Sequence, residues 1–305
     1  MTAFLTILGF NSAIPTANSF PTAQLLEMAD RSFLIDCGEG TQVQLRRAKA
    51  KFSKINHIFI SHLHGDHCFG LPGLIASLRL LGRETPLYVY GPKGIKKMLE
   101  TIFSITETHR DFEVIYTELE AHHSQKIYED SRVEVHTIPL DHRIYCNGYL
   151  FREKPKPRNL NMDEIRKYDE IEVCDYQNLK NGKDFQLKDG YILKNEVLTL
   201  PPKPPLSYAF CSDTRFKEDI IPIIKGVDLL YHEATFLKDL KEMADYTGHS
   251  TAEEAATIAQ KAGVKKLLLG HFSNRYSDYS VFTDEARGIF PETYLPKMLE
   301  RIEIG

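Results

Sequence analysis

The stretch that decides the fold is HIFISHLHGDH, residues 57–67, in which four metal-capable side chains follow an apolar run. The run before His62 is predicted to be a strand, and the glycine-rich turn after the motif leads into a helical pattern. Side chains two positions apart point the same way in an extended segment, so His62 and His64 can share one cation. Asp66 and His67, just past the bend, are then expected to reach a neighbouring cation.

The chemistry of this motif indicates a hydrolase. Neutral imidazole and carboxylate are natural zinc ligands, and a catalytic zinc site keeps one position for a water whose pKa falls to near neutrality. Two cations that hold one hydroxide also neutralise the non-bridging oxygens and the leaving group of a phosphodiester. The alternative is a solvated loop with accidental histidines, but the strand–turn–helix setting favours a metal site. We therefore expect two Zn²⁺ ions, with Mn²⁺ as the alternative cation.

Further candidate ligands stand at the ends of other apolar runs. Strands are predicted at LTILGF, SFLID, HIFIS, PLYVYG, VEVHTIPL, LSYAFCS, DLLYHE and KKLLLGH. Several of these runs end in a metal-capable residue, namely Asp36, His62, His142, Asp213, His232 and His271. Such residues are expected to gather along one edge of the sheets. Alone, each of His142, Asp213 and His271 would more often be structural, but their shared context makes them candidate ligands.

The composition bounds the class of protein. With 42% apolar and 26% charged residues, the 305-residue chain is typical of a globular protein that forms one α/β core with an insertion. Its 5 cysteines are scattered without a CxxC pair, which argues against a disulfide framework and a thiolate metal site. The formal net charge of -4 is not that of a general nucleic-acid binder, so a polyanionic partner requires a local basic patch.

Helical patterns alternate with the strands. They are predicted at GLIASLRLLG, GIKKMLETIF, EDIIPIIKG and TAEEAATIAQKAG. The last is expected to begin with a capping box of Ser250 and Glu253 and to end at Gly263. The segment TAFLTILGF lacks the basic flank and long apolar stretch of a signal peptide, and no run is long enough to cross a bilayer. A cytoplasmic protein without a membrane partner is expected.

The chain changes character between residues 152 and 205, which are polar and charged. We interpret them as a protruding arm inserted into a catalytic domain that spans residues 1–305. Pro155 and Pro157 at its entry and the prolines of PPKPP at its exit favour extended hinges. The run FREKPKPRN is a candidate RNA-binding patch, although most such runs are only solvated surface. Its cations are Arg152, Lys154, Lys156 and Arg158.

The motifs taken together resemble a known family. HLHGDH with IDCGEGTQ, PLDH, SDTR, HEATF, GHST and GHFSNRY, in this order, is similar to ribonuclease Z of the metallo-β-lactamase superfamily over nearly the whole chain. The resemblance implies a four-layer αββα sandwich. It also implies a zinc-dependent endoribonuclease in which a metal-bridging hydroxide attacks precursor tRNA, so that the 3' trailer is removed and a 3'-hydroxyl remains on the tRNA.

By this resemblance, the two zinc ions have separate ligand sets joined by one bridging residue. The implied sets are His62, His64 and His142 for one ion, Asp66, His67 and His271 for the other, with Asp213 bridging both. Asp36 would orient the HLHGDH loop without binding metal, the alternative being an ordinary turn carboxylate.

Three residues are implied in catalysis. Asp66 is a candidate for deprotonating the water as well as a ligand. His249, in TGHST, would act as an acid toward the departing 3' oxygen or stabilise transition-state charge. Glu233, in HEATF, either takes part in the site or only holds a neighbouring loop, and the role of His232 is equally open.

The chain departs from the family pattern in two places. PTANSF at residues 15–20 replaces the usual PxKxRN, so Ala17, Ser19 and Phe20 stand where Lys, Arg and Asn are expected. The cut position and the discrimination against CCA ends are therefore not fixed by the resemblance. The arm reads VCDYQNLKNG where the family commonly has a Gly-Pro element.

Several functions and assemblies remain as alternatives. A phosphodiesterase or arylsulfatase that acts on small esters would use the same metals, but the long arm disfavours it. A lactonase or thioesterase fits the motifs less well, and a non-catalytic RNA-binding protein would be expected to have lost ligands. The resemblance also implies a homodimer in which one arm directs RNA to the partner's site. The LPGLIASLRLLG helix is then either part of that contact or simply core.

Overall fold

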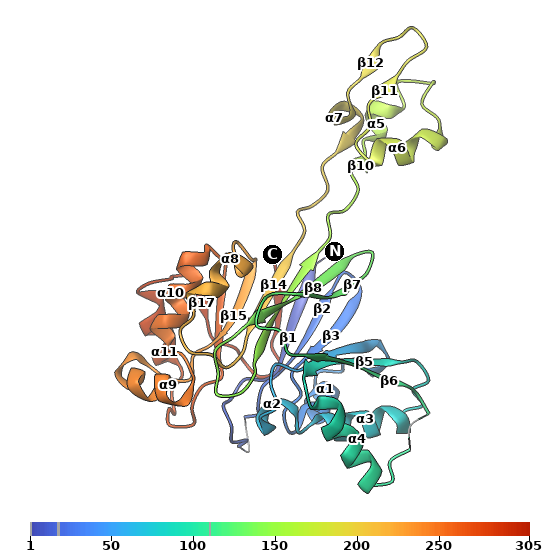
Figure 1. Cartoon of the computed structure of the whole chain (residues 1–305). Helices are drawn as coiled ribbons and strands as arrows, with labels where there is room; N and C mark the ends of the chain where they lie inside the picture. Colours follow the sequence, from blue (N-terminus) through green and yellow to red (C-terminus); the bar gives the residue numbers. More distant parts are fainter. Residues whose placement is uncertain (1, 17–18, 110) are drawn as a thin grey trace. The chain divides into compact units, whose positions relative to one another are not determined.

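The computed structural model describes residues 2–16, 19–109 and 111–305. Two compact units make up the chain, Met1–Arg152 with Leu206–Gly305, and Glu153–Pro205. We call the first the core unit and the second the arm. Figure 1 shows the core unit as two facing sheets with helices on their outer sides.

The first sheet of the core unit has seven strands in the order β18-β1-β2-β3-β4-β5-β6. β18, β1, β2 and β3 pair antiparallel, whereas β3, β4, β5 and β6 pair parallel. The strands are β1 Ala3–Gly9, β2 Ala23–Met28, β3 Arg31–Ile35, β4 Ile55–Phe59, β5 Leu87–Pro92, β6 Val114–Leu119 and β18 Arg301–Ile304. Because β3 and β4 are parallel, the segments that follow them begin at the same edge of the sheet.

The second sheet also has seven strands, in the order β17-β16-β15-β14-β9-β8-β7. β14, β15, β16 and β17 pair parallel, and β9 joins β14 antiparallel. The strands are β7 Lys126–Glu129, β8 Val133–Pro139, β9 Asn147–Glu153, β14 Ser207–Cys211, β15 Leu229–Glu233, β16 Leu267–Gly270 and β17 Thr293–Tyr294. The segments after β14, β15 and β16 therefore share one edge, as those after β3 and β4 do in the first sheet.

Alternating side chains join the two sheets. The rings of Phe33 and Phe59 both lie 5.3 Å from the ring of Phe151, which belongs to the second sheet. Their sequence neighbours Leu34 and Ile58 belong to the core that the first sheet forms with its helices. Because strand side chains point alternately to opposite faces, each strand of the sandwich contributes to an inner and an outer core.

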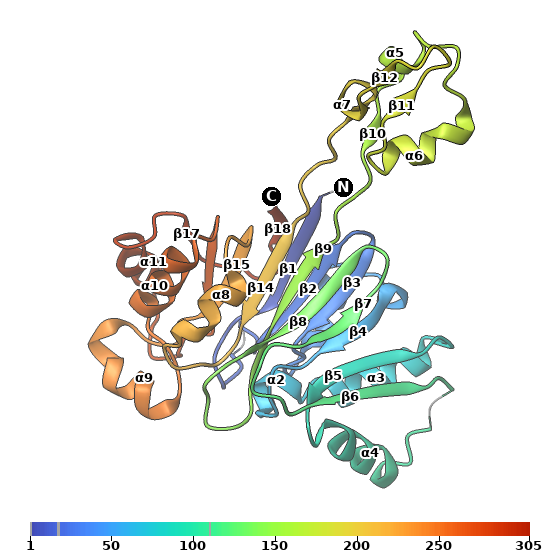
Figure 2. The same ribbon diagram turned by 45° about the horizontal axis from the view of Figure 1, so that its top comes forward.

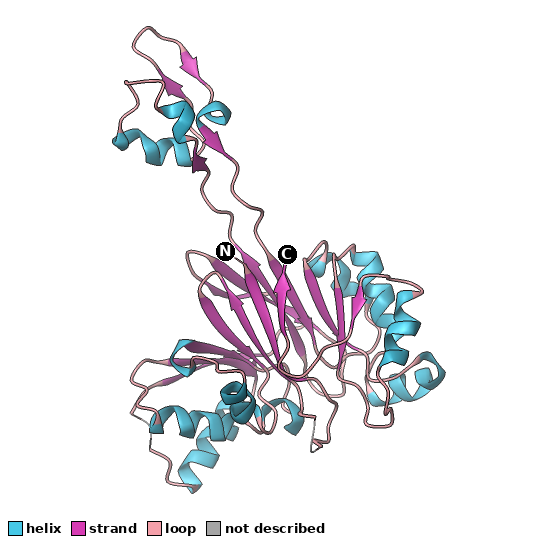
Figure 3. Ribbon diagram, turned by 180° about the vertical axis from the view of Figure 1, so that it is seen from behind, coloured by secondary structure: helices cyan, strands magenta, loops and turns pink. Residues whose placement is uncertain are grey.

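Helices cover the outer face of each sheet, and Figures 2 and 3 show these outer layers. The first sheet carries α1 Thr41–Arg47, η1 Phe52–Lys54, α2 Gly65–Cys68, α3 Leu71–Leu80 and α4 Ile95–Ile105. The second carries η3 Glu218–Ile220, α8 Ile221–Ile224, η4 Lys238–Leu240, α9 Lys241–Thr247, α10 Ala252–Ala262 and α11 Ser280–Arg287. The αββα sandwich expected from the resemblance is confirmed.

The predicted elements are largely present. Every predicted strand appears, and α3 buries Leu71, Leu74, Ile75 and Leu78 as core. The structure adds strands that the periodicity did not single out, among them β2, β6, β7, β9 and β18. α10 ends at Gly263, whose φ of 61° is the left-handed conformation that glycine adopts easily.

The predicted capping box of α10 is wrong by one residue. Thr251, not Ser250, is the N-cap: its hydroxyl accepts from the Glu254 amide at 3.2 Å, and the Glu254 carboxylate accepts from the Thr251 amide at 3.0 Å. The Ser250 hydroxyl donates instead to the Thr214 carbonyl at 2.7 Å. Ser-Thr and Glu-Glu are adjacent pairs here, so both registers satisfy the capping pattern and only tertiary contacts select between them.

The arm has a small core of its own, formed by Ile165, Ile171, Leu179, Leu193 and Leu198. Its elements are β10 Asn159–Leu160, α5 Met162–Ile165, η2 Val173–Asp175, α6 Tyr176–Lys180, β11 Phe185–Gln186, β12 Ile192–Leu193, α7 Asn195–Leu198 and β13 Thr199–Leu200. The proline-containing residues 154–158 and 201–206 form neither helix nor strand.

Two further observations concern the described residues as a whole. No helix among them combines the length and the apolar character needed to cross a membrane. All five cysteines are free thiols, of which Cys174 in the arm is exposed and the other four are buried.

The packing between the sheets gives a prediction of stability. Phe151→Ala removes a fully buried ring that contacts both sheets, and we expect it to lower the free energy of unfolding by about 3–5 kcal/mol. Ile105→Ala, at a residue that is 77% exposed, serves as the control and should change it by less than about 0.5 kcal/mol. Urea titration followed by circular dichroism measures both. Similar losses in the two variants would contradict this account of the core.

Candidate metal centre

The structure brings the seven predicted ligands together at the edge where the parallel strands end. His62 follows β4, His142 follows β8, Asp213 follows β14 and His271 follows β16. The donor atoms form two main groups, within each of which they lie at most 4.8 Å apart. The groups are His62, His64, His142 and Asp213, and Asp66, His67 and His271.

The first group consists of four inward-facing atoms. His62 Nε2 lies 3.0 Å from His64 Nδ1, and His142 Nε2 lies 3.3 Å from that same atom. Asp213 Oδ2 lies 3.5 Å from His62 Nε2 and 3.8 Å from His142 Nε2. Three imidazoles and one carboxylate thus point at one spot.

The second group has the same form. His67 Nε2 lies 3.3 Å from His271 Nε2 and 3.4 Å from Asp66 Oδ2, and His271 Nε2 lies 3.5 Å from that oxygen. Asp213 Oδ1 lies 3.4 Å from His67 Nε2 and 3.2 Å from His271 Nε2. Asp213 therefore contributes one carboxylate oxygen to each group.

These donor sets fit a metal ion in each group. With zinc–ligand bonds of about 2.0–2.1 Å, neighbouring ligands of a tetrahedral ion lie about 3.3 Å apart, which is the spacing found here. Three imidazole nitrogens aimed at one spot cannot all satisfy one another, because each hydrogen bond needs one donor and one acceptor. A cation at that spot would satisfy all of them.

The electrostatics of the two groups agree with this fit. Burial lowers the pKa of His62, His64 and His142 below their ordinary value and favours the neutral imidazole that binds cations. Burial alone would also lower the pKa of His67, but Asp213, Asp66 and Asp36 together raise it well above its ordinary value. The second group thus carries an excess of buried negative charge that a cation would neutralise.

The outward nitrogens of the imidazoles are held by the protein. His142 Nδ1 lies 2.7 Å from the Gly248 carbonyl, and His271 Nδ1 lies 3.0 Å from Thr235 Oγ1. His67 Nδ1 lies 2.7 Å from Asp36 Oδ2. Such outer hydrogen bonds fix the tautomer and the orientation of a metal-binding ring, so that the inner nitrogen keeps its lone pair for the cation.

Asp36 lies behind the candidate ligands rather than among them. Besides His67, its carboxylate accepts from the Ser61 amide at 2.7 Å and the Ser61 hydroxyl at 2.9 Å, and it is fully buried. Asp36 and His271 both have left-handed backbone conformations, with φ of 55° and 60°. Non-glycine residues rarely adopt this conformation, and it clusters at functional sites where surrounding contacts hold it in place.

Glu233 and His249 form a pair beside the ligands. Glu233 Oε1 lies 2.9 Å from His249 Nδ1 and also accepts from the Thr214 and Ser250 amides, at 3.1 and 3.0 Å. Burial alone would lower the pKa of His249, but Glu233 raises it above its ordinary value. Because Glu233 is fully buried and contacts only protein groups, it can act on a substrate only through His249 and the loops it holds.

Two hydroxyl groups in the site were not singled out from the sequence. Ser61 Oγ lies 3.1 Å from His62 Nδ1 and 3.0 Å from Ser212 Oγ, while Thr235 Oγ1 lies 3.2 Å from His249 Nδ1. Ser61 lies in the HIFIS strand and Thr235 in the HEATF motif. Their position in these motifs is the only feature of the sequence that indicates a place in the site. His232, left open above, contacts its own strand through a 2.7 Å bond from Nδ1 to the Glu233 carbonyl and is not among the grouped donors.

The segment just before the PTANSF stretch contacts Asp66. The Ala13 amide donates to Asp66 Oδ2 at 2.9 Å. Ser19 forms hydrogen bonds with Thr16 within the loop. The guanidinium carbon of Arg47 lies over the Phe20 ring, 5.7 Å from the ring centroid. Ala17 lies outside the described residues. The substituted positions that are described thus make local contacts within the protein.

The predicted RNA-binding cations are largely engaged within their own units. Arg152, in β9 of the core unit, donates to the Ile223 carbonyl at 3.1 Å. Within the arm, Lys156 pairs with Glu153 at 3.6 Å and Arg158 donates to Thr199 Oγ1 at 2.6 Å, while Lys154 is half-buried. A phosphate would have to compete with these contacts.

Comparison with known proteins identifies relatives over the whole length. The chain is 46% identical to ribonuclease Z of Bacteroides fragilis over 96% of both chains. It is also 47% identical to ribonuclease Z of Bacteroides thetaiotaomicron over 96% of this chain and 92% of that one. The relative from Porphyromonas gingivalis, also a ribonuclease Z, is 46% identical over 98% of both.

Solved structures agree in fold. The short form of human tRNase Z is 25% identical, with a TM-score of 0.71 over 99% of both chains. The metallo-β-lactamase fold protein YhfI of Bacillus subtilis shares the fold at 19% identity, with a TM-score of 0.70 over 99% of this chain and 100% of that one.

A family model described as anti-Pycsar protein Apyc1 matches residues 3–153 only. The full-length relatives, by contrast, cover both sheets and the residues of the arm. With 46% to 47% identity over at least 96% of its length, the chain belongs to the ribonuclease Z family.

Proposed function

We propose that this protein is a zinc-dependent endoribonuclease that removes the 3' trailer from precursor tRNA and leaves a 3'-hydroxyl on the tRNA. One observation carries the proposal: seven donor side chains from the ends of four strands form two groups that share the carboxylate of Asp213. The second support is family membership, because the full-length relatives are ribonuclease Z enzymes.

The proposed metal centre holds two zinc ions, with manganese as the alternative. His62, His64 and His142 would hold one ion, Asp66, His67 and His271 the other, and Asp213 both. When bound, such a pair supplies Lewis-acid activation of water and neutralises charge on the phosphate. Asp66 keeps 12% of its side chain exposed, so its carboxylate is the ligand placed to take a proton from a nucleophilic water.

His249 is proposed to assist the departing 3' oxygen of the tRNA. Glu233 engages Nδ1, and no described residue bonds Nε2, so Nε2 can face the substrate. Because Glu233 raises the pKa of His249 against the effect of burial, the ring is favoured in the protonated form that donates. Asp213 Oδ2 lies 3.9 Å from His249 Nδ1, and its negative charge also raises the pKa of His249.

The arm is proposed to bind the tRNA away from the cut. The candidate contacts are the cations predicted from the sequence, namely Lys154, Lys156 and Arg158 in the arm and Arg152 in the core unit, whose present partners a phosphate would replace. We further propose a homodimer, with Leu80 and Leu81 at the exposed end of α3 as apolar contact area. We place the protein in the cytoplasm, where bacteria such as those of its relatives make precursor tRNA.

Cleavage of a precursor tRNA that carries a 3' trailer tests the proposal directly. We expect cuts next to the acceptor stem, with 3'-hydroxyl and 5'-phosphate ends, because the attacking water must displace the 3' oxygen. A chelator should reduce cleavage to background, and added zinc should restore it. Mapping the product ends measures the position of the cut.

The alternative function, hydrolysis of small esters by a phosphodiesterase or arylsulfatase, gives a different result in the same assay. It predicts efficient turnover of small diesters or aryl sulfates with no specific cut in precursor tRNA. That outcome would contradict the proposal and leave the metal centre in place.

The pair of Glu233 and His249 gives a second prediction. His249→Ala should lower kcat on precursor tRNA about a hundredfold, because the 3' oxygen loses its proton donor. Hydrolysis of bis(p-nitrophenyl) phosphate should change little, because p-nitrophenolate leaves without protonation. Glu233→Gln should lower kcat in the same direction with zinc content unchanged, and adding it to His249→Ala should have little further effect. Equal losses on both substrates would contradict this role.

Replacing the arm tests its proposed role in binding RNA. Ser207 pairs with Arg152 in register, so a short Gly-Ser turn can join β9 to β14 in place of residues 153–205. We expect KM for precursor tRNA to rise at least tenfold, while hydrolysis of bis(p-nitrophenyl) phosphate stays unchanged. If KM for precursor tRNA does not change, the arm is not a binding element.

A further inference from the structure

A cavity of about 820 Å³ in the core unit opens beside the proposed metal centre. His142 forms part of its lining, together with the rest of the loop after β8. Other walls come from the end of β5, from the segment after β6, which carries His122, and from the segment after Asp213, which carries Lys217. His142, a proposed ligand of one zinc ion, therefore also lines this cavity.

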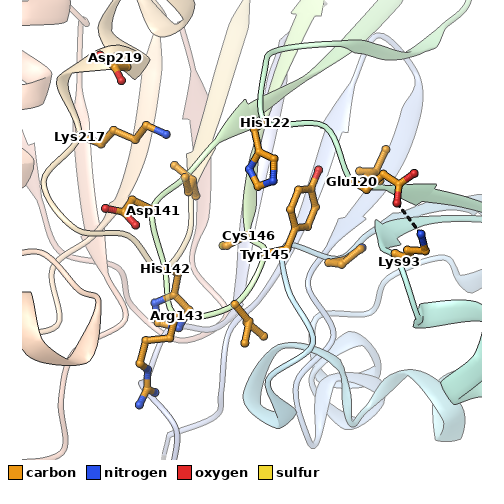
Figure 4. Close-up of a pocket in the computed structure, with 14 residues that line it drawn as sticks. Lys93, Glu120, His122, Asp141, His142, Arg143, Tyr145, Cys146, Lys217 and Asp219 are labelled. Atoms are coloured by element: carbon orange, nitrogen blue, oxygen red, sulfur yellow. Dashed lines mark hydrogen bonds and ion pairs between the residues drawn. The ribbon is translucent and has the colours of Figure 1, made fainter.

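The walls differ in chemistry, as Figure 4 shows. The amino group of Lys217 points toward the cavity from one side, and the rings of His122 and Tyr145 lie across from it. These two rings pack edge to face, with centroids 5.5 Å apart. The Tyr145 hydroxyl donates to the Ala121 carbonyl at 3.0 Å, which holds its ring in place.

Most of the acidic side chains around the cavity are already neutralised. Glu120 pairs with Lys93 at 2.8 Å, and Asp141 pairs with Arg215 at 3.2 Å. Among the described residues, neither Lys217 nor Asp219 has an ion-pair partner. Arg143, which also lines the cavity, has no ion-pair partner among the described residues either. The cavity thus offers two cations without a carboxylate partner, one carboxylate that accepts hydrogen bonds, and an aromatic wall.

This combination fits a nucleotide better than a bare anion. A bare phosphate needs several cations and gains nothing from an aromatic wall. An unpaired nucleotide presents a phosphate for a lysine, a base whose face packs on rings, and amino groups that donate to a carboxylate.

We propose that this cavity binds the first unpaired nucleotide of the trailer, with its base on the His122 and Tyr145 wall and the next phosphate along the trailer on Lys217. The inference rests on the proposed function. His249, on the side of the departing tRNA oxygen, does not line the cavity, and neither does His271. The trailer keeps the cleaved phosphate, so it extends away from His249 and toward His142.

The test compares precursor tRNAs with trailers of one and five nucleotides. The one-nucleotide trailer lacks the phosphate assigned to Lys217, so the wild type should bind it less well. Lys217→Ala should raise KM for the five-nucleotide trailer about tenfold, the usual effect of one lost charged hydrogen bond, and leave KM for the one-nucleotide trailer unchanged. An abasic first trailer nucleotide should raise KM of the wild type, because the ring wall loses its base.

Lys225→Ala is the matched control, because Lys225 is exposed in the core unit and does not line the cavity. It should leave both KM values unchanged, and all variants should hydrolyse bis(p-nitrophenyl) phosphate at the wild-type rate. The inference is overturned if Lys217→Ala raises KM equally for both trailers or for neither. If the wild type hydrolyses the small diester but cuts neither precursor, the proposed function itself fails, which is a separate result.

Discussion

The carboxylate of Asp213 is the group on which the rest of the site depends. It is only 2% exposed, and its two oxygens face two different sets of donors. A buried carboxylate is costly unless charge and hydrogen bonds compensate it. Burial by itself raises the pKa of Asp213. The histidines around Asp213 outweigh this effect and hold its pKa below its ordinary value, so the carboxylate stays ionised. Two cations that share this carboxylate would account for every inward-facing donor.

The sandwich explains how such a centre can be built from distant parts of the sequence. Parallel strands in both sheets end at one edge, so short segments after β4, β14 and β16 deliver ligands without a long excursion of the chain. The rigid core behind them, with rings packed between the sheets, fixes these strand ends. Ser61, Thr235 and Glu233 then orient the imidazoles from behind, as pre-organised sites require.

The sequence predicted which donor side chains come together because their pattern is local or repeats a local feature. HLHGDH is contiguous, and His142, Asp213 and His271 each follow an apolar run. It could not predict Ser61 and Thr235 as supporting groups, because isolated hydroxyl residues carry no spacing signal. The capping box was placed one residue early because Ser250 and Thr251 are both good N-caps, and the bond from Ser250 to Thr214 depends on a strand distant in sequence. The partners of Arg152 and Arg158 are tertiary contacts of the same kind.

The number of zinc ions retained per chain after dialysis, measured by elemental analysis, tests the central claim most directly. The account predicts two ions in the wild type, one in His142→Ala and in His271→Ala, and none held tightly in Asp213→Ala, because only Asp213 belongs to both donor sets. Retention of two ions by Asp213→Ala, or a single ion in the wild type, would contradict a centre built around one shared carboxylate.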